Sequence, residues 1–288
     1  MELDDAYANA AHIPGAEAFP PRWAQAAQMW RNREAHDDHA RLDLPYGRGV
    51  RERFDLFLPE GAPRGLVVFV HGGYWLKFDR SYWSHLAAGP VARGWAVAMP
   101  SYDLCPKVRI AQITRQVARA VDVAAGVVAG PLVLTGHSAG GHLVARMLAP
   151  GMLEPEVAAR VRKVVPISPV ADLRPLLRTS MNTDLKLDQA EAEAESPVLM
   201  RERLEVPVTV WVGAKERPAF LDQARWLSEA WGCERVVAES RHHFDVIEPL
   251  EIGDSGLVEV LLGWFAASTG DPSGTTDVSE SGGKTGAS

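Results

Sequence analysis

The chain has 288 residues, of which 47% are hydrophobic, enough for one large domain with a sizeable core or for two small ones. Thirty Lys and Arg residues stand against 37 Asp and Glu, a net charge of −7, and no basic run could follow a phosphate backbone. A nucleic acid partner is therefore not expected. Cys105 and Cys233 lie far apart without metal-ligand spacing, so we expect reduced thiols and no metal site.

The N-terminal residues indicate neither a leader nor a membrane segment. The stretch MELDDAYANAAHIPG is acidic and lacks the basic and apolar regions of a signal peptide. No uninterrupted apolar run reaches the roughly 18 residues that a membrane span needs. We therefore expect a cytoplasmic protein with no membrane contact. Residues 1–45 contain helical stretches such as PRWAQAAQMWRNREA, and we expect them to form an N-terminal arm packed on the domain.

Short β-branched runs alternate with helical patterns from residue 51 onward. The first, RERFDLFLP (51–59), alternates polar and apolar residues, which is typical of an antiparallel, half-exposed edge strand. Apolar residues recur at helical spacing over 110–129, and HLVARMLAP (142–150) begins a helix directly after a turn. Six further runs predict buried strands: LVVFV (66–70), WAVAMP (95–100), PLVLTG (131–136), KVVPIS (163–168), VPVTVWVG (206–213) and CERVVAE (233–239). The alternation predicts an α/β fold with one mostly parallel sheet covered by helices on both faces.

We expect this sheet to belong to a single domain over residues 46–267. Residues 173–203 lie between two predicted strands and are too many for one crossover helix, so we expect a small cap over the strand ends. From residue 268 the chain is almost entirely Gly, Ser, Thr and charged residues, which cannot bury enough apolar surface to offset their ordering entropy. Residues 268–288 are therefore predicted to form a disordered tail.

The stretch TGHSAGGHL (135–143) places Ser138 between two glycines, where a buried strand meets a helix. A sharp turn at that position would raise the serine hydroxyl above the sheet and point the N–H groups of the new helix at the site. Gly136 and Gly140 remove side chains that would clash in such a turn. Ser138 is thus the predicted nucleophile, and the adjacent His137 is expected to point away into the packing.

A serine nucleophile needs a histidine base oriented by an acid, and both are expected after later strands. The segment RHHFDVIEPL offers His242 and His243, and neighbouring histidines in an extended loop point opposite ways. His243, beside Phe244 and further apolar residues, is the predicted base. Glu216, in the loop after VPVTVWVG, is the predicted acid, and Asp172 after the preceding strand is the alternative.

The stretch HGGYW (71–75) follows the strand predicted over 66–70. Its paired glycines allow the backbone to turn N–H groups into a cleft, as an oxyanion hole requires. Three backbone N–H groups are expected to bind the oxyanion: those of Gly73, Tyr74 and Ala139. The N–H of Gly72 is an alternative donor. His71 is then expected to fix the loop. The aromatic side chains of Trp75 and Tyr82 are candidates for lining the substrate pocket.

Together, HGGYW, GHSAGGHL, SYDLCPKVRIAQITRQV, ISPVADLRPLL and HHFDVIEPL resemble the kynurenine formamidase (arylformamidase) family of α/β-hydrolases. The resemblance extends from LDDAYANAAHIPGAE to about residue 267. It implies hydrolysis of N-formyl-L-kynurenine to formate and L-kynurenine in tryptophan catabolism, without metal or cofactor, with Ser138 as nucleophile and His243 as base. The family's acid is usually aspartate, whereas this loop has Lys215 and Glu216. Glutamate can orient the imidazole as aspartate does.

Two other functions are open on the sequence alone. General esterases share these motifs and act on acyl esters, so a carboxylesterase of broad specificity on the same triad is the first alternative. A hydrolase fold without activity, used as a binding module, is the second, because a fold does not guarantee a function. The expected partner of the enzyme is a small-molecule substrate. The sequence leaves open whether the chain forms a homodimer.

Overall fold

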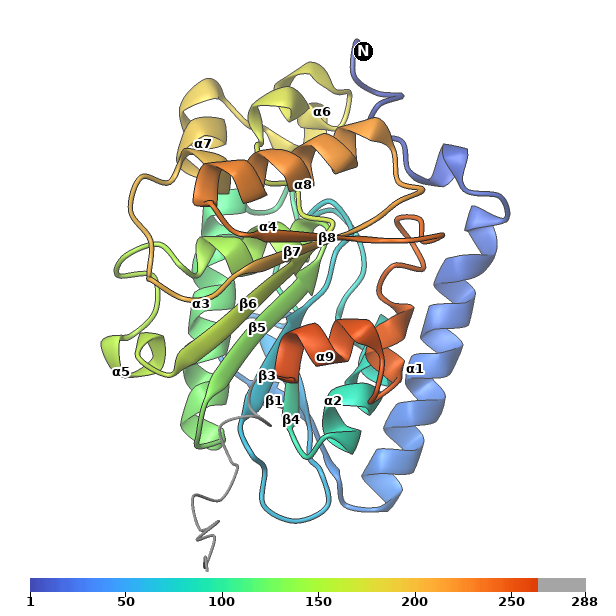
Figure 1. Cartoon of the computed structure of the whole chain (residues 1–288), viewed down its shortest axis with the longest axis vertical. Coiled ribbons are helices and arrows are strands. Elements are labelled where there is room, and N and C mark those ends of the chain that lie inside the picture. The colour runs from blue at the N-terminus through green and yellow to red at the C-terminus, as the bar shows by residue number, and fades with distance from the viewer. Residues whose placement is uncertain (264–288) are drawn as a thin grey trace, which may run out of the picture.

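The computed structural model describes residues 1–263, so the tail predicted over 268–288 lies outside the described residues. Within them, one eight-stranded sheet has the order β1-β2-β4-β3-β5-β6-β7-β8 (Figure 1). Its strands are β1 (Ala40–Pro45), β2 (Arg53–Phe57), β3 (Leu66–Val70), β4 (Ala96–Pro100), β5 (Leu132–His137), β6 (Val161–Ile167), β7 (Thr209–Gly213) and β8 (Glu234–Ala238). Strands from β4 to β8 pair in parallel, and β1–β2 and β2–β4 are antiparallel. The predicted α/β fold is confirmed.

Helices connect most of these strands. The α-helices are α1 (Phe19–His36), α2 (Ala88–Ala92), α3 (Ile110–Val127), α4 (Ala139–Arg146), α5 (Pro155–Ala158), α6 (Asn182–Leu185), α7 (Gln189–Ala194), α8 (Pro218–Trp231) and α9 (Gly256–Leu262). The short 3-10 helices are η1 (Ala10–His12), η2 (Ala16–Ala18), η3 (Arg80–Tyr82), η4 (Ser84–Ala87), η5 (Arg174–Arg178), η6 (Pro197–Leu199) and η7 (Glu248–Glu251). In the part of the chain that the structure describes, none of the helices combines the length and the apolar character of a membrane span.

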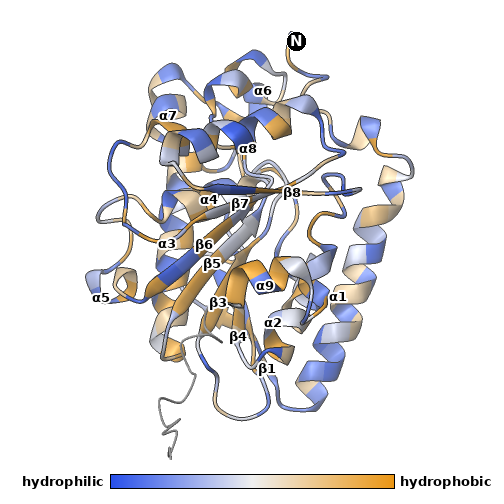
Figure 2. Ribbon diagram, viewed as in Figure 1, coloured by the Kyte–Doolittle hydropathy of each residue, from blue (hydrophilic) through white to orange (hydrophobic). Residues whose placement is uncertain are grey.

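The two faces of the sheet are covered by different helices, because successive strand residues point to opposite sides. Val68 and Val70 of β3 pack in one buried cluster with side chains of α3, α4 and α8. Val67 and Phe69 pack in a second cluster, with α9, η4 and Trp23 of α1. In Figure 2, α9 is mostly hydrophobic in colour, whereas α1 mixes both colours along its length. Both faces of β3 are therefore buried, as its continuous apolar run predicts.

The strand predicted over residues 51–59 is antiparallel, but the prediction that it forms a half-exposed edge is wrong. β2 pairs with β1 on one side and β4 on the other, and four of its five residues are buried. The edge strand is β1, whose residues 40–45 fall within the range predicted as an N-terminal arm. Its sequence ARLDLP has no buried residue and hence little apolar signal. Earlier in that range, α1 packs against η3 and η4.

The strand order creates a crevice at the carboxyl end of β3. This strand lies between β4 and β5, so the chain leaves it toward one side and later returns on the other. In open α/β sheets, ligands bind outside the strand ends at such a switch point. Val70, the last residue of β3, pairs with Gly136 of β5. The loop HGGYW and Ser138 therefore begin side by side.

Candidate active site

Ser138 occupies a sharp turn between β5 and α4. Its φ of 57° is in the left-handed region, which is costly for a residue with a side chain. Backbone hydrogen bonds hold this conformation: the Ser138 N–H donates to the carbonyl of Ile167 at 2.8 Å, and its carbonyl accepts from the N–H of His142 at 3.0 Å. A Cβ at Gly140 would overlap the carbonyl oxygen of Val70, so only glycine allows α4 to begin this close to β3.

Glu216 and His243, the predicted acid and base, meet in the structure. His243 Nδ1 lies 2.6 Å from Glu216 Oε2, and both side chains are almost completely buried. The other carboxylate oxygen of Glu216 accepts hydrogen bonds from the N–H of Gly213, at 2.9 Å, and from the hydroxyl of Ser168. Because an ionised carboxylate only accepts, the neutral imidazole carries its proton on Nδ1. Nε2 is then unprotonated, as a general base requires.

Ser138 and His243 line the same cavity, which has a volume of about 780 Å³. The Ser138 hydroxyl has no hydrogen-bond partner among residues 1–263. A hydrogen bond between nucleophile and base is often long without substrate and tightens when substrate binds, so this geometry is compatible with a serine–histidine pair. Gly72, Gly73 and Tyr74 line the cavity as well.

The loop after β3 has an unusual backbone that leaves several amides free. Gly73, Tyr74 and Trp75 have φ values of 115°, 53° and 58°, three left-handed residues in succession. In the described part of the chain, the N–H groups of Gly73, Tyr74 and Ala139 have no hydrogen-bond partner. Unpaired amides beside a serine are the donors that an oxyanion hole uses. Ala139 is buried directly after Ser138 and is not part of the cavity lining.

His71 supports this loop from below. Its ring stacks on Tyr102 with centroids 4.3 Å apart, and its Nδ1 lies 2.7 Å from the carbonyl oxygen of Gly72. The hydroxyl of Tyr102 donates to the carbonyl of His71 at 2.8 Å. Burial lowers the pKa of His71 to about 4, so its ring is neutral near pH 7. These contacts agree with a structural role for His71.

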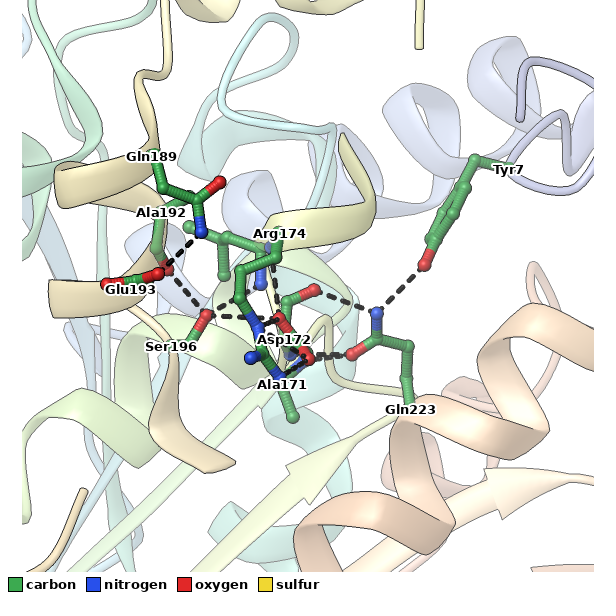
Figure 3. Close-up of polar contacts among 10 residues, drawn as sticks. Tyr7, Ala171, Asp172, Arg174, Gln189, Ala192, Glu193, Ser196 and Gln223 are labelled. Atoms are coloured by element: carbon green, nitrogen blue, oxygen red, sulfur yellow. Dashed lines mark hydrogen bonds and ion pairs between the residues drawn. The ribbon is translucent and has the colours of Figure 1, made fainter. Parts of the chain in front are cut away.

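Asp172, the alternative acid, belongs to a different network, which Figure 3 shows. Its carboxylate binds Arg174, with Oδ2 2.6 Å from Nη2, and it contacts none of the histidines. Gln223 accepts from the backbone N–H groups of Ala171 and Asp172, both at 2.7 Å. The same amide donates to the Tyr7 hydroxyl at 2.9 Å. Gln223 thus links Tyr7 of the N-terminal segment to the backbone of the loop after β6.

His137 and His242, which neighbour Ser138 and His243 in the sequence, lie in different surroundings. His137 does not point away as predicted: its ring centroid lies 4.6 Å from that of His243, and it lines the cavity. The reason is the alternation of β5, which puts its last residue on the same face as Val133, toward the loop that carries His243. Burial lowers the pKa of His137 well below its ordinary value. His242 accepts from the N–H of Phe244 at 3.1 Å and does not line the cavity.

Trp75 and Tyr82, the predicted pocket residues, do not line the cavity. Trp75 is fully buried and packs edge-on against His142, with centroids 5.1 Å apart, because the left-handed turn directs its indole toward α4. Tyr82 packs on Phe78 instead. The cavity has an aromatic wall, which we define as Trp23, Phe78, Trp83 and Phe244.

Most of the remaining cavity surface comes from residues 7–20, which the sequence did not identify as part of the site. Tyr74 donates its hydroxyl hydrogen to the carbonyl of Tyr7 at 2.7 Å, and Asn9 Nδ2 lies 3.4 Å from the Tyr74 hydroxyl. Of the segment 173–203, which was expected to cover the strand ends, only Met181 lines the cavity. Figure 1 shows α6 and α7 beside α8, at the end of the molecule where the N-terminus lies.

The described residues contain no group of three or more His, Cys, Asp or Glu side chains that could bind a metal ion. That the reaction needs no metal or cofactor remains a prediction.

The fold and the turn at Ser138 define a class of protein. The model of the alpha/beta hydrolase family matches residues 67–281, so the protein is an α/β-hydrolase. Kynurenine formamidase of Salmo salar is 29% identical over 238 residues, covering 77% of this chain and 80% of its own. Kynurenine formamidase of Drosophila melanogaster is 31% identical over 241 residues, covering 76% and 79%. The chain belongs to the kynurenine formamidase family of α/β-hydrolases, a family of enzymes.

A solved structure is also closely similar. A crystal structure from Silicibacter sp. TM1040, described as that of a candidate thioesterase, shares 63% sequence identity and superposes with a TM-score of 0.89. The match covers 91% of this chain and 99% of that one. Because the chain belongs to a family of enzymes, the alternative of an inactive binding module is not needed to explain this site.

Proposed function

We propose that this protein is a serine hydrolase that converts N-formyl-L-kynurenine to L-kynurenine and formate. The choice of substrate is supported by the similarity, over about three quarters of the chain, to relatives named kynurenine formamidase. The chemistry is supported by the 2.6 Å contact between Glu216 and His243 beside the cavity that Ser138 lines. A serine, a base and an oriented acid are the minimal set for acyl transfer at neutral pH.

In the first half of the proposed reaction, His243 Nε2 takes the proton of the Ser138 hydroxyl while the oxygen attacks the formyl carbon. The negative oxygen of the tetrahedral intermediate accepts hydrogen bonds from the N–H groups of Gly73, Tyr74 and Ala139. Glu216 stabilises the imidazolium that forms on His243. The imidazolium then protonates the arylamine nitrogen as the carbon–nitrogen bond breaks. The products of this half are L-kynurenine and a formyl ester of Ser138.

In the second half, water replaces the arylamine. His243 removes a proton from a water molecule whose oxygen attacks the formyl ester, and a second tetrahedral intermediate forms at the same N–H groups. Collapse of this intermediate transfers the proton from His243 to Ser138 and releases formic acid, which loses its proton to solvent and becomes formate. The enzyme ends in its starting protonation state, so no cofactor is consumed.

The cavity suits an aryl substrate. Ring centroids within the aromatic wall lie close together, with Trp23 4.7 Å from Trp83 and 5.4 Å from Phe244. Aromatic side chains bind a planar ring through stacked or edge-on contacts. The cavity volume of about 780 Å³ falls in the range of pockets for molecules of drug size, which includes N-formylkynurenine. The aryl ring is therefore expected to bind at this wall while the formyl group reaches Ser138.

A carboxylesterase of broad acyl specificity on the same triad is the second candidate. The observation that favours it is the 63% identity to a protein described as a candidate thioesterase, since oxygen esters and thioesters are cleaved by the same acyl transfer. Both candidates need a serine nucleophile, and they differ in the size of the acyl group and in the leaving group.

Steady-state rates of the purified protein separate the two candidates. N-formyl-L-kynurenine is compared with p-nitrophenyl acetate and p-nitrophenyl butyrate, through absorbance of kynurenine and nitrophenolate. The proposal predicts a kcat/KM for the formamide well above that for either ester. An ester preferred over the formamide would make the carboxylesterase the correct assignment. The cytoplasmic location stays a prediction from the sequence, and the oligomeric state stays open.

A further inference from the structure

One acidic and one basic side chain line the main cavity. Lys77 follows the loop HGGYW, and Glu17 lies in η2 of the N-terminal segment. Both are exposed, and neither forms an ion pair or a side-chain hydrogen bond with any residue from 1 to 263. Apart from histidines, the other residues that line the cavity are uncharged. Among residues 1–263, the cavity therefore offers one unpaired cation and one unpaired anion on a largely apolar surface.

Other charged groups near the site are not available to a ligand of this cavity. Arg217 is paired with Asp5, whose Oδ2 lies 2.6 Å from Nη2. Lys215 lines a second, smaller cavity of about 290 Å³ and does not line the main cavity. Glu216 already forms a hydrogen bond with His243. Lys77 and Glu17 are thus distinguished by two properties together: they line the cavity with Ser138, and they are unpaired.

We propose that Lys77 and Glu17 recognise the amino acid end of the substrate, an inference that rests on the proposed function. N-formylkynurenine has a formamide on its aryl ring and, at its other end, an α-carboxylate and an α-ammonium group. With the ring on the aromatic wall and the formyl group at Ser138, the zwitterionic end is the part that remains. The Lys77 ammonium binds the α-carboxylate, and the Glu17 carboxylate binds the α-ammonium group. The two charges make the site specific for an amino acid that carries an aryl formamide.

This arrangement predicts which kinetic constant changes when Lys77 or Glu17 is replaced. The amino acid end does not change charge during deformylation, so its contacts stabilise the bound substrate and the transition state equally. Loss of such a contact raises KM and leaves kcat unchanged. Because both side chains are exposed, solvent screens each ion pair, and we expect roughly a fivefold change in KM for each.

Three substrates and two variants test the proposal. N-formyl-L-kynurenine carries both charges, its decarboxylated analogue N-formylkynuramine carries only the ammonium group, and formanilide carries neither. Lys77→Met should raise KM about fivefold for the first substrate alone. Glu17→Gln should raise KM for the first two, and neither variant should change KM for formanilide. Lys186→Met and Glu156→Gln are matched controls, because both residues are exposed and lie outside the cavity.

The outcomes separate this inference from the function it rests on. If the variants change KM for formanilide as much as for N-formyl-L-kynurenine, or change none of the three, the charges do not recognise the amino acid group. If the wild-type protein uses formanilide and N-formyl-L-kynurenine equally well, the inference fails while the formamidase activity stands. If the wild-type protein hydrolyses none of the three, both the inference and the proposed function are overturned.

Discussion

Replacing Glu216 with glutamine exchanges one carboxylate oxygen for an NH₂ group and keeps the shape of the side chain. In the wild-type protein, Glu216 Oε2 accepts the proton on His243 Nδ1, at 2.6 Å. In the wild-type protein the other carboxylate oxygen, Oε1, accepts from the N–H of Gly213 at 2.9 Å. If the carbonyl oxygen of the glutamine accepts this same hydrogen bond, its NH₂ group must face His243. An NH₂ group only donates, so Nδ1 loses its proton and Nε2 gains one. The imidazole then cannot accept the proton of Ser138.

The expected cost is large. A histidine held in the wrong tautomer by an amide in place of the acid lowers kcat by roughly 10⁴-fold in the serine proteases. That factor corresponds to about 5 kcal/mol of activation free energy. KM should change by no more than a few fold, because Glu216 does not line the main cavity. The fold should persist, since glutamine still accepts from the N–H of Gly213.

The assay is the initial rate of N-formyl-L-kynurenine hydrolysis, with circular dichroism as the check on folding. Asp172→Asn is the matched control, because Asp172 binds the half-exposed Arg174 and no histidine. Asp172 is buried while Arg174 is exposed, so the substitution should cost some stability. It leaves the contact between Glu216 and His243 intact, so the control should keep nearly full activity. A folded Glu216→Gln protein with near wild-type rates, or a control that alone loses activity, would refute the role of Glu216.

Two further predictions concern the fold that carries the site. Gly140→Ala should destabilise the protein by about 3 kcal/mol and abolish activity, because the new Cβ overlaps the carbonyl of Val70; an unchanged Tm would contradict this packing. Burial lowers the pKa of His71, of His85 and of His142 to about 4, so the unfolded chain binds more protons between pH 4 and 6.5. Burial raises the pKa of Asp55 to about 6, so at this residue the folded chain binds more protons than the unfolded chain as the pH falls. This effect of Asp55 stabilises the fold at lower pH and offsets part of the loss from the histidines. Urea unfolding should therefore show a net loss of about 4 kcal/mol from pH 7 to pH 5, and equal stability at both would contradict the burial of these groups.

The central part of the fold could be predicted from the sequence, because buried parallel strands are continuous apolar runs. The run predicted over 66–70 coincides with β3, and that over 131–136 differs from β5 by one residue at each end. Once these two strands are neighbours, their carboxyl ends bring HGGYW and Ser138 together. The chain order of serine, acid and histidine then pointed to Glu216 and His243, which the structure brings within 2.6 Å of each other.

The cavity wall could not be predicted in the same way. Residues 7–20 reach the site through contacts with partners far along the chain, such as Tyr7 with Gln223, and they carry no periodic apolar pattern. Trp75 was assigned to the pocket by its position after the paired glycines, but three left-handed residues in a row reverse the direction in which it points. Burial of an aromatic side chain within a loop depends on the backbone conformation, which the residue types alone do not specify.

The most direct measurement of the central claim is formate release from N-formyl-L-kynurenine by the wild-type protein and by Ser138→Ala. The account predicts that the wild-type protein releases formate and L-kynurenine in equal amounts. The variant, with an unchanged circular dichroism spectrum, should be slower by at least about 10³-fold. A folded Ser138→Ala protein that keeps substantial activity would show that another group attacks the formyl carbon, and the assignment of Ser138 as the nucleophile would be wrong.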